Sequence, residues 1–335
     1  MQHEYFCIEQ LDLAAKQLHT RQPSFARFAL ILTDNIVELM LYRRCKQIIT
    51  EDDGYFSYGT QFGGKHEFDA KTLAKVMGQH FDERPKFCRK QGLLQEDEMD
   101  FVIIAHKYRN EVYHVGIRHE DFLFPIAWQY HEFACDIFKK LSPLYRVWSS
   151  HDVISETVAR HTGSDGIRIE SPDDDIAVVT TSLKASKPPL DLQFSEYLGQ
   201  AAIRRVDEFN CALQWLSEEL KVDQSKLLVD LQFKGFVSAE DSPHIEEFST
   251  VSSKEEFERF VSKVRAAWKP KFPASPGDRW MKRAKSLRGD ANPLLAMKKF
   301  QSILDEMEAI VEIVRTAAIE LENYFQLQSD ISRGK

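Results

Sequence analysis

The chain of 335 residues is long enough for two domains, and its 43% hydrophobic and 29% charged residues are typical of a globular protein that is not membrane-embedded. The five cysteines are isolated from one another, so the sequence predicts neither a zinc site nor a disulfide framework, and no metal or cofactor is expected. Neither a secretory signal nor a membrane-length apolar run is recognisable, which predicts a cytoplasmic protein that does not bind a membrane.

The first 149 residues predict a helical bundle. A short helix over 1–20 is followed by a long one from Ser24, a good N-cap residue, to about residue 47. The long helix is apolar nearly all round, so it is expected at the centre of the bundle. Asp34 and Glu38 interrupt it four residues apart, and we expect them to pair with a cation, with Arg109 as the candidate, rather than to form a catalytic pair.

A loop rich in glycine and aromatic residues is predicted over 50–66. Its aromatic side chains either stack on unpaired bases or pack onto the bundle, and the sequence leaves both interpretations open. The stretch from Gly59 to Lys65 reads G-x4-G-K, which matches the first part of a nucleotide-binding P-loop. It differs from a true P-loop because His66 stands where a magnesium-binding Ser or Thr is needed. Further helices are predicted over 67–80, 83–91, 95–116 and 120–141.

The helix predicted over 95–116 ends in three polar residues with chemical potential, Arg109, Asn110 and His114. Met99 and Ile103 share the face of Asn110 and His114, so this face is also expected to pack, against the chain itself or against another copy. Arginine holds phosphate through a planar fork of donors, and histidine takes and gives protons near neutral pH. These residue types suffice to cut a phosphodiester without a metal. The core face of the same helix is predicted to consist of Phe101, Ile104, Ala105, Tyr108, Val112 and Val115.

The motif R-N-E-V-Y-H at 109–114 and its helical setting resemble the HEPN family of all-helical domains, many of which are metal-independent ribonucleases. Residues 25–44 look like the long first helix of such domains, and residues 81–100 look like the approach to the motif helix. The resemblance covers residues 1 to about 150. It implies a bundle that dimerises, so that two motifs meet in one composite cleft.

The resemblance also implies the roles of the motif residues. His114 would act in acid–base catalysis while the ribose 2′-hydroxyl attacks the adjacent phosphate, Arg109 would hold that phosphate, and Asn110 would support them. The products would carry a 2′,3′-cyclic phosphate or 3′-phosphate and a 5′-hydroxyl. Some family members lack nuclease activity, so the alternative is a non-catalytic module that binds RNA, a nucleotide or a partner protein.

The segment 150–191 is predicted to form a small β-hairpin and a linker. Residues 167–169 and 176–179 are rich in β-branched side chains, and an acidic turn, Ser171 to Asp175, separates them. Residues 192–335 predict a mostly helical second domain, with helices over 193–221, 255–268 and 292–327 and either a strand pair or a short helix over 227–237. The expected fold class is therefore mainly α, with this hairpin inserted between the two helical domains.

The formal net charge of −8 argues at first against a nucleic-acid ligand, but the charge is uneven. Residues 263–299 contain eleven Lys or Arg and two acids, which gives this segment +9 and the remainder −17. Basic residues beside Trp280 suit an RNA backbone with a stacked base, or else form a solvated helix face or internal ion pairs. The candidate RNA-binding residues are Lys282, Arg283, Lys285 and Arg288.

The combined hypothesis is a metal-independent endoribonuclease that acts on RNA as a homodimer, as a toxin or an antiviral defence effector. A free ribonuclease would harm its own cell, so an inhibitory or regulatory protein partner is expected.

Overall fold

In the computed structural model the chain is helical, and the described residues contain no strand, which confirms the mainly α class. The structure describes residues 2–59, 67–115, 120–141, 153–163, 166–167, 172–238, 250–273 and 275–333. Within these ranges, no helix combines the length and apolarity that crossing a bilayer requires.

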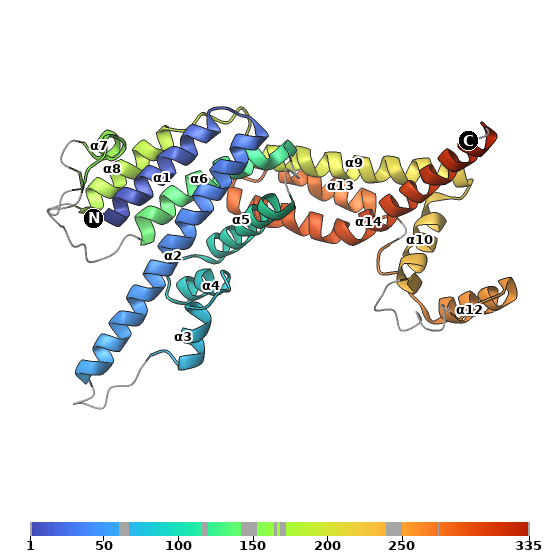
Figure 1. The fold of residues 1–335 in the computed structure, drawn as a ribbon, viewed down its shortest axis with the longest axis horizontal. Helices are drawn as coiled ribbons and strands as arrows, with labels where there is room; N and C mark the ends of the chain where they lie inside the picture. Colours follow the sequence, from blue (N-terminus) through green and yellow to red (C-terminus); the bar gives the residue numbers. More distant parts are fainter. Residues whose placement is uncertain are drawn as a thin grey trace. The chain divides into compact units, whose positions relative to one another are not determined.

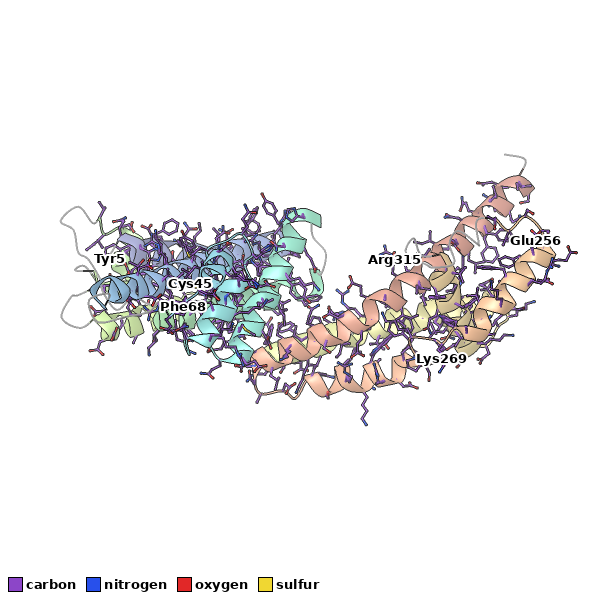
Figure 2. All side chains as sticks on the ribbon, turned by 90° about the horizontal axis from the view of Figure 1, so that it is seen from below. Tyr5, Cys45, Phe68, Glu256, Lys269 and Arg315 are labelled. Carbon is purple, nitrogen blue, oxygen red and sulfur yellow. The ribbon has the colours of Figure 1, made fainter. Side chains whose placement is uncertain are left out.

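The chain divides into two units, one of residues 1–197 and 290–298 and one of residues 198–289 and 299–335. The helices of the first unit are α1 (Gln2–Leu18), α2 (Pro23–Gly59), α3 (Ala70–Val76), α4 (Glu83–Lys90), α5 (Glu96–Val115), α6 (Glu120–Leu141), α7 (Glu156–Thr162) and α8 (Pro172–Ala185). The second unit consists of α9 (Phe194–Leu220), α10 (Gln224–Ser238), α12 (Lys254–Ala267), α13 (Pro276–Leu287) and α14 (Pro293–Ser332), except that the first residues of α9 and α14 belong to the first unit. Figure 2 labels three residues in each unit: Tyr5, Cys45 and Phe68, and Glu256, Lys269 and Arg315.

Helix α2 is the central element of the first unit, as its apolar sequence predicted. It packs against α1, α4, α5 and α6 (Figure 1). Its buried residues Leu30, Val37 and Leu41 are fully enclosed, which fixes one side of the helix in the core. Asp34 lies on this same side of the helix and Glu38 lies at its edge, and both reach α5, as the hydrogen bonds described below show.

The two ends of α2 differ from the prediction. The helix begins at Pro23, because proline suits the first helical position, and the carbonyl of Gln22 accepts from the amides of Phe25 and Ala26. Ser24 therefore lies inside the first turn and is not the N-cap. The helix also continues to Gly59, so the predicted loop is wrong over 50–59: polar residues can occupy an exposed helix face, and composition alone did not distinguish this from a loop.

Several features of the predicted loop lie outside the described part of the chain. The structure describes neither residues 60–66 nor the side chains of residues 55–59. Two predicted features therefore lie outside the described residues: the aromatic side chains of Tyr55, Phe56, Tyr58 and Phe62, and the segment from Gly59 to Lys65.

The predicted β-hairpin is wrong, because residues 176–179 lie within helix α8. Pro172 is its first residue, and three aspartates fill its first turn, where carboxylates complement the helix dipole. Ile176, Val179 and Leu183 are buried at helical spacing. Burial at this spacing outweighs the weak β-propensity of branched residues. Residues 168–170, the rest of the expected first strand, lie outside the described ranges.

A buried carboxylate fastens α7 and α8 to α1. Asp12 of α1 accepts hydrogen bonds from His161 of α7 at 3.0 Å and from Lys16 at 2.8 Å. His161 in turn contacts Ser182 of α8 at 2.8 Å through its other ring nitrogen. Burial alone would raise the pKa of Asp12, but the hydrogen bonds from Lys16 and His161 hold that pKa below its ordinary value. The segment 150–191, which carries α7 and α8, is therefore part of the first unit.

Four of the five cysteines are buried, and the exception is Cys211, which is exposed on α9. Cys45 of α2 and Cys88 of α4 lie with their sulfur atoms 3.7 Å apart. This separation exceeds a disulfide bond, and both cysteines are free. The hydrogen bond with Cys45, together with burial, raises the pKa of the Cys88 thiol, which keeps it protonated.

In the second unit, α9, α13 and α14 pack closely. Trp280 of α13 is fully buried and meets Phe209 of α9 edge to face at 5.4 Å. Gly277 allows this approach, because a Cβ there would lie 2.3 Å from Oδ1 of Asn210. The segment left open between a strand pair and a helix is α10. Helix α12 begins with a capping box between Ser253 and Glu256.

Candidate functional site

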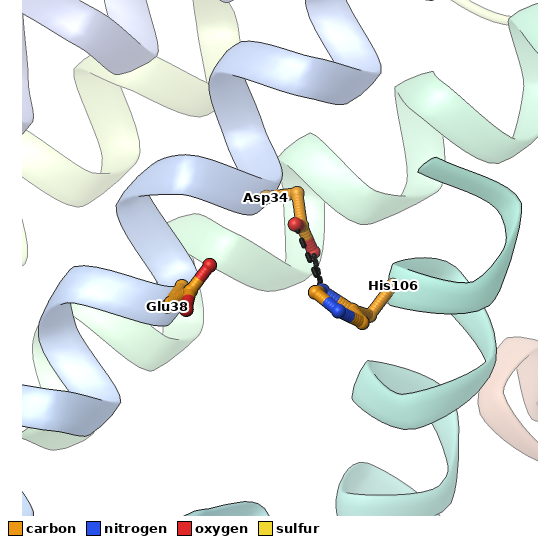
Figure 3. Close-up of side chains that lie close together, drawn as sticks. All are labelled: Asp34, Glu38 and His106. Atoms are coloured by element: carbon orange, nitrogen blue, oxygen red, sulfur yellow. Dashed lines mark hydrogen bonds and ion pairs between the residues drawn. The ribbon is translucent and has the colours of Figure 1, made fainter. Parts of the chain in front are cut away.

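The candidate site forms where α2 faces α5, around the buried carboxylate of Asp34. Its side chain has no exposed surface. Oδ2 accepts from Nε of Arg109 at 2.6 Å and lies 3.0 Å from Nδ1 of His106, while Oδ1 accepts from the hydroxyl of Tyr130 at 2.9 Å. Figure 3 shows Asp34 and His106 facing each other, with Glu38 one turn further along α2. Three helices, α2, α5 and α6, are thus joined at one carboxylate.

Glu38 extends this network to α4. Its Oε2 accepts from Nη2 of Arg109 at 3.2 Å, and its Oε1 accepts from Nη1 of Arg84 at 3.1 Å. Arg84 also donates to the carbonyl of Gly78 at 2.8 Å, and its guanidinium carbon lies 5.4 Å from the centre of the Tyr42 ring. Two carboxylates are therefore balanced by two guanidinium groups, as a largely buried charged cluster requires. The predicted pairing of Asp34 and Glu38 with Arg109 is present.

Tyr130 contributes a neutral donor to the cluster. It is fully buried on α6, and this burial, reinforced by the adjacent Asp34 carboxylate, raises its pKa well above the ordinary value. The hydroxyl therefore remains protonated and donates to Asp34.

His106 is the site residue that the sequence did not reveal. Its ring stacks on Phe81 with centroids 3.7 Å apart and planes 6° from parallel, and 13% of its side chain is exposed. His106 precedes Arg109 by three residues, so both project toward α2. This i, i+3 relationship, combined with an isolated aspartate in an apolar helix, was the signal available in the sequence. Arg84 and Tyr130 gave no comparable pattern.

The three motif residues occupy different environments on α5. Arg109 is 19% exposed and donates from Nη1 to Oδ1 of Asn110 at 2.9 Å, so these two residues are joined. Asn110 is half-buried, whereas His114, one turn further on, is exposed and has its ring edge-on to Tyr113 at 5.1 Å. The predicted core face is confirmed at Phe101, Ala105, Tyr108 and Val112. The structure thus places Arg109 in the bundle and His114 at its surface.

The cluster suits cations already in the chain better than a metal ion. Asp34, Glu38 and His106 offer ligand atoms within 4.8 Å of one another. However, the same carboxylate oxygens hold Arg109 and Arg84, and a metal ion would have to displace these positive groups. The donor set therefore does not favour a resident metal.

The four candidate RNA-binding residues lie in or directly after α13. Lys282, Lys285 and Arg288 are exposed, whereas Arg283 donates to Ser302 at 3.1 Å and to Glu306. Arg283 therefore forms the internal ion pair that the sequence left as an alternative. The suggested stacking of a base on Trp280 is wrong, because this residue is enclosed in the core between α9, α13 and α14. An aromatic residue at helical spacing packs inward when its neighbours on that face are apolar.

Comparisons with family models, with curated proteins and with solved structures gave no match to this chain.

Proposed function

We propose that the chain is a metal-independent endoribonuclease with a HEPN-type site at Arg109, Asn110 and His114. The observation that carries the proposal is the anchoring of Arg109: two carboxylates and Asn110 fix its guanidinium on the helix that also carries an exposed histidine. An arginine fixed in this way is preorganised to stabilise charge on a phosphate, and an exposed histidine is accessible to a substrate.

The hydrogen bonding of Arg109 supports phosphate binding. Toward the described residues, its nitrogens Nε, Nη1 and Nη2 each donate one hydrogen bond. A guanidinium group has five N–H groups, so two remain, one on each terminal nitrogen. A pair of terminal N–H groups matches two oxygens of a phosphate.

In the proposed reaction, His114 removes the proton of the ribose 2′-hydroxyl, and the 2′-oxygen attacks the adjacent phosphorus. Arg109 holds the non-bridging oxygens as their charge increases. The bond from phosphorus to the 5′-oxygen breaks, which leaves a 2′,3′-cyclic phosphate and a 5′-hydroxyl. Positioning and charge stabilisation by these side chains supply the rate enhancement that a metal supplies elsewhere.

We further propose a homodimer in which two copies bring their motifs to one composite cleft, with the face of Met99, Ile103 and His114 at the interface. Met99 and Ile103 are half-buried in the single chain, so part of each side chain is accessible to a second copy. In this proposal Lys282, Lys285 and Arg288 contact the RNA backbone and an inhibitory partner restrains the enzyme, which acts as a toxin or antiviral effector.

A non-catalytic module is the second candidate, and one observation favours it. Asp34 and Glu38 compensate the charge of Arg109, which weakens its attraction for a phosphate. In this alternative the network only stabilises the bundle, and the chain binds RNA, a nucleotide or a partner protein without cutting RNA.

The test is cleavage of single-stranded and structured RNA by the full chain in EDTA. We expect cleavage by the wild type, a loss of about 10²–10⁴-fold for His114→Ala, and no change for His80→Ala, which alters an exposed histidine outside the site. Unchanged cleavage by His114→Ala would refute the site. A wild type that cuts no RNA but changes its oligomeric state with a ligand would favour the second candidate.

A further inference from the structure

Asp34 connects Arg109 to His106, a second histidine close to the motif. Both His106 and Arg109 contact the same oxygen, Oδ2, at 3.0 and 2.6 Å. Their two nitrogens are therefore no more than about 5.6 Å apart (3.0 Å plus 2.6 Å). We propose that His106, oriented by Asp34 and Phe81, is the second proton-transfer group of the site, donating a proton to the leaving 5′-oxygen. This inference rests on the proposed ribonuclease function.

The surroundings of His106 hold the ring in one orientation. Nδ1 faces Asp34, and a carboxylate accepts only, so Nδ1 carries a proton and Nε2 is the atom that exchanges one. The parallel stack on Phe81 prevents the ring from rotating out of its stacking plane. A carboxylate that holds an imidazole in this way fixes both its tautomer and its direction.

Charged and titratable groups surround this histidine on every element packed against it. Asp34 and Glu38 approach from α2, and Arg109 lies beside His106 on α5. Arg84 of α4 and Tyr130 of α6 complete the cluster. The partial exposure of the His106 side chain, 13%, contrasts with the complete burial of Asp34. The dyad therefore combines a buried orienting group with a partly exposed imidazole, and a purely structural ion pair does not require that division.

His106 and His114 of one chain cannot serve the same phosphodiester. They are eight residues apart on α5, which is about 12 Å along the helix axis, and both side chains lean in the same direction. Each proton-transfer group must come within about 3 Å of its oxygen, and both oxygens are bonded to the same phosphorus. We therefore place His106 and Arg109 of one copy opposite His114 of a second copy, which gives two equivalent catalytic centres in the one composite cleft.

The step is balanced. His114 of one copy takes the proton from the 2′-hydroxyl, and the electron pair of the 2′-oxygen forms the new bond to phosphorus. The electron pair of the breaking phosphorus–oxygen bond goes to the 5′-oxygen, which takes the proton from Nε2 of His106. Hydrolysis of the cyclic phosphate, or exchange with water, resets both rings.

The first test compares RNA with a substrate whose 5′-oxygen is replaced by sulfur, because a thiolate leaves without protonation. We expect His106→Gln to lose more than about 100-fold on RNA and less than about tenfold on the sulfur substrate. His80→Gln, an exposed histidine one residue before Phe81, should match the wild type on both. Equal losses on the two substrates would mean that His106 only maintains the structure and would overturn the inference.

The second test mixes two inactive variants, His106→Gln and His114→Ala, under conditions that exchange subunits. Half of the dimers are then mixed and one of their two catalytic centres is intact, so about one quarter of wild-type activity should return. No recovery overturns the arrangement across two copies. If the wild type itself cuts no RNA, the proposed function fails, and that result is separate from failure of His106 because it is read on the unaltered protein.

Discussion

The buried network around Asp34 should make the stability of the first unit, the N-terminal unit, highly sensitive to one isosteric change, Asp34→Asn. The carboxylate has no exposed surface and contacts Arg109, His106 and Tyr130. The amide keeps the shape but removes the negative charge and leaves Arg109 with less compensation. Breaking one partner of a buried ion pair costs about 3–5 kcal/mol, so we expect that loss of stability in this unit.

Asp191→Asn is a matched control. Asp191 pairs with Arg21 at 2.5 Å, but both side chains are largely exposed, at 65% and 42%. Exposed pairs contribute about 0–1 kcal/mol, so this variant should remain within that range of the wild type. The two substitutions are chemically identical, and any difference reflects burial and the number of hydrogen bonds.

Hydrogen exchange is the suitable assay because the chain has two units. Peptides from α2, α5 and α6 report the free energy of opening of the N-terminal unit alone. Two results would contradict the expected role of burial: an opening free energy for Asp34→Asn close to that of the wild type, or an equally large loss for Asp191→Asn. In the first case the network around Arg109 would not be the anchor of the site.

Three further predictions concern stability. Burial lowers the pKa of His131 to about 4 from 6.5, so at low pH the unfolded chain binds a proton that the folded chain does not, and the first unit should lose up to about 3 kcal/mol of stability from pH 6.5 to pH 4. In hydrogen exchange, His131→Gln should remove this pH dependence of the opening free energy. Ser253→Ala should destabilise α12 by about 1 kcal/mol through loss of its capping box, measured as faster exchange in α12 peptides, and unchanged exchange would contradict the cap. Trp280→Ala should cost about 3–5 kcal/mol in peptides of α9 and α14, whereas an exposed RNA-stacking residue would cost almost nothing.

Much of the helical architecture was accessible from the sequence because it depends on spacing. The bounds predicted for the helices around residues 83–91, 95–116 and 120–141 agree closely with α4, α5 and α6. The pairing of Asp34 and Glu38 with Arg109 was also predicted, since charges four residues apart in an apolar helix need a buried partner.

Other features depend on contacts between distant segments. The contact of His106 with Asp34 and its stack on Phe81 join residues that are distant in sequence, and the i, i+3 spacing of His106 and Arg109 does not by itself identify these contacts. Trp280 looked like a binding residue because basic neighbours surround it in sequence, whereas α13 turns Lys282 and Lys285 outward and the indole inward. The hairpin failed because β-propensity was weighed above the helical spacing of Ile176, Val179 and Leu183.

The chemistry of the RNA ends produced in EDTA distinguishes the proposed ribonuclease from other nucleases. Mass spectrometry of the products made by the wild type should find 2′,3′-cyclic phosphate or 3′-phosphate at one end and 5′-hydroxyl at the other, and His114→Ala and Arg109→Ala should yield neither product. Ends with 5′-phosphate and 3′-hydroxyl, or cleavage that stops when EDTA removes the metal, would show that the chain does not cut RNA by 2′-hydroxyl attack at this site.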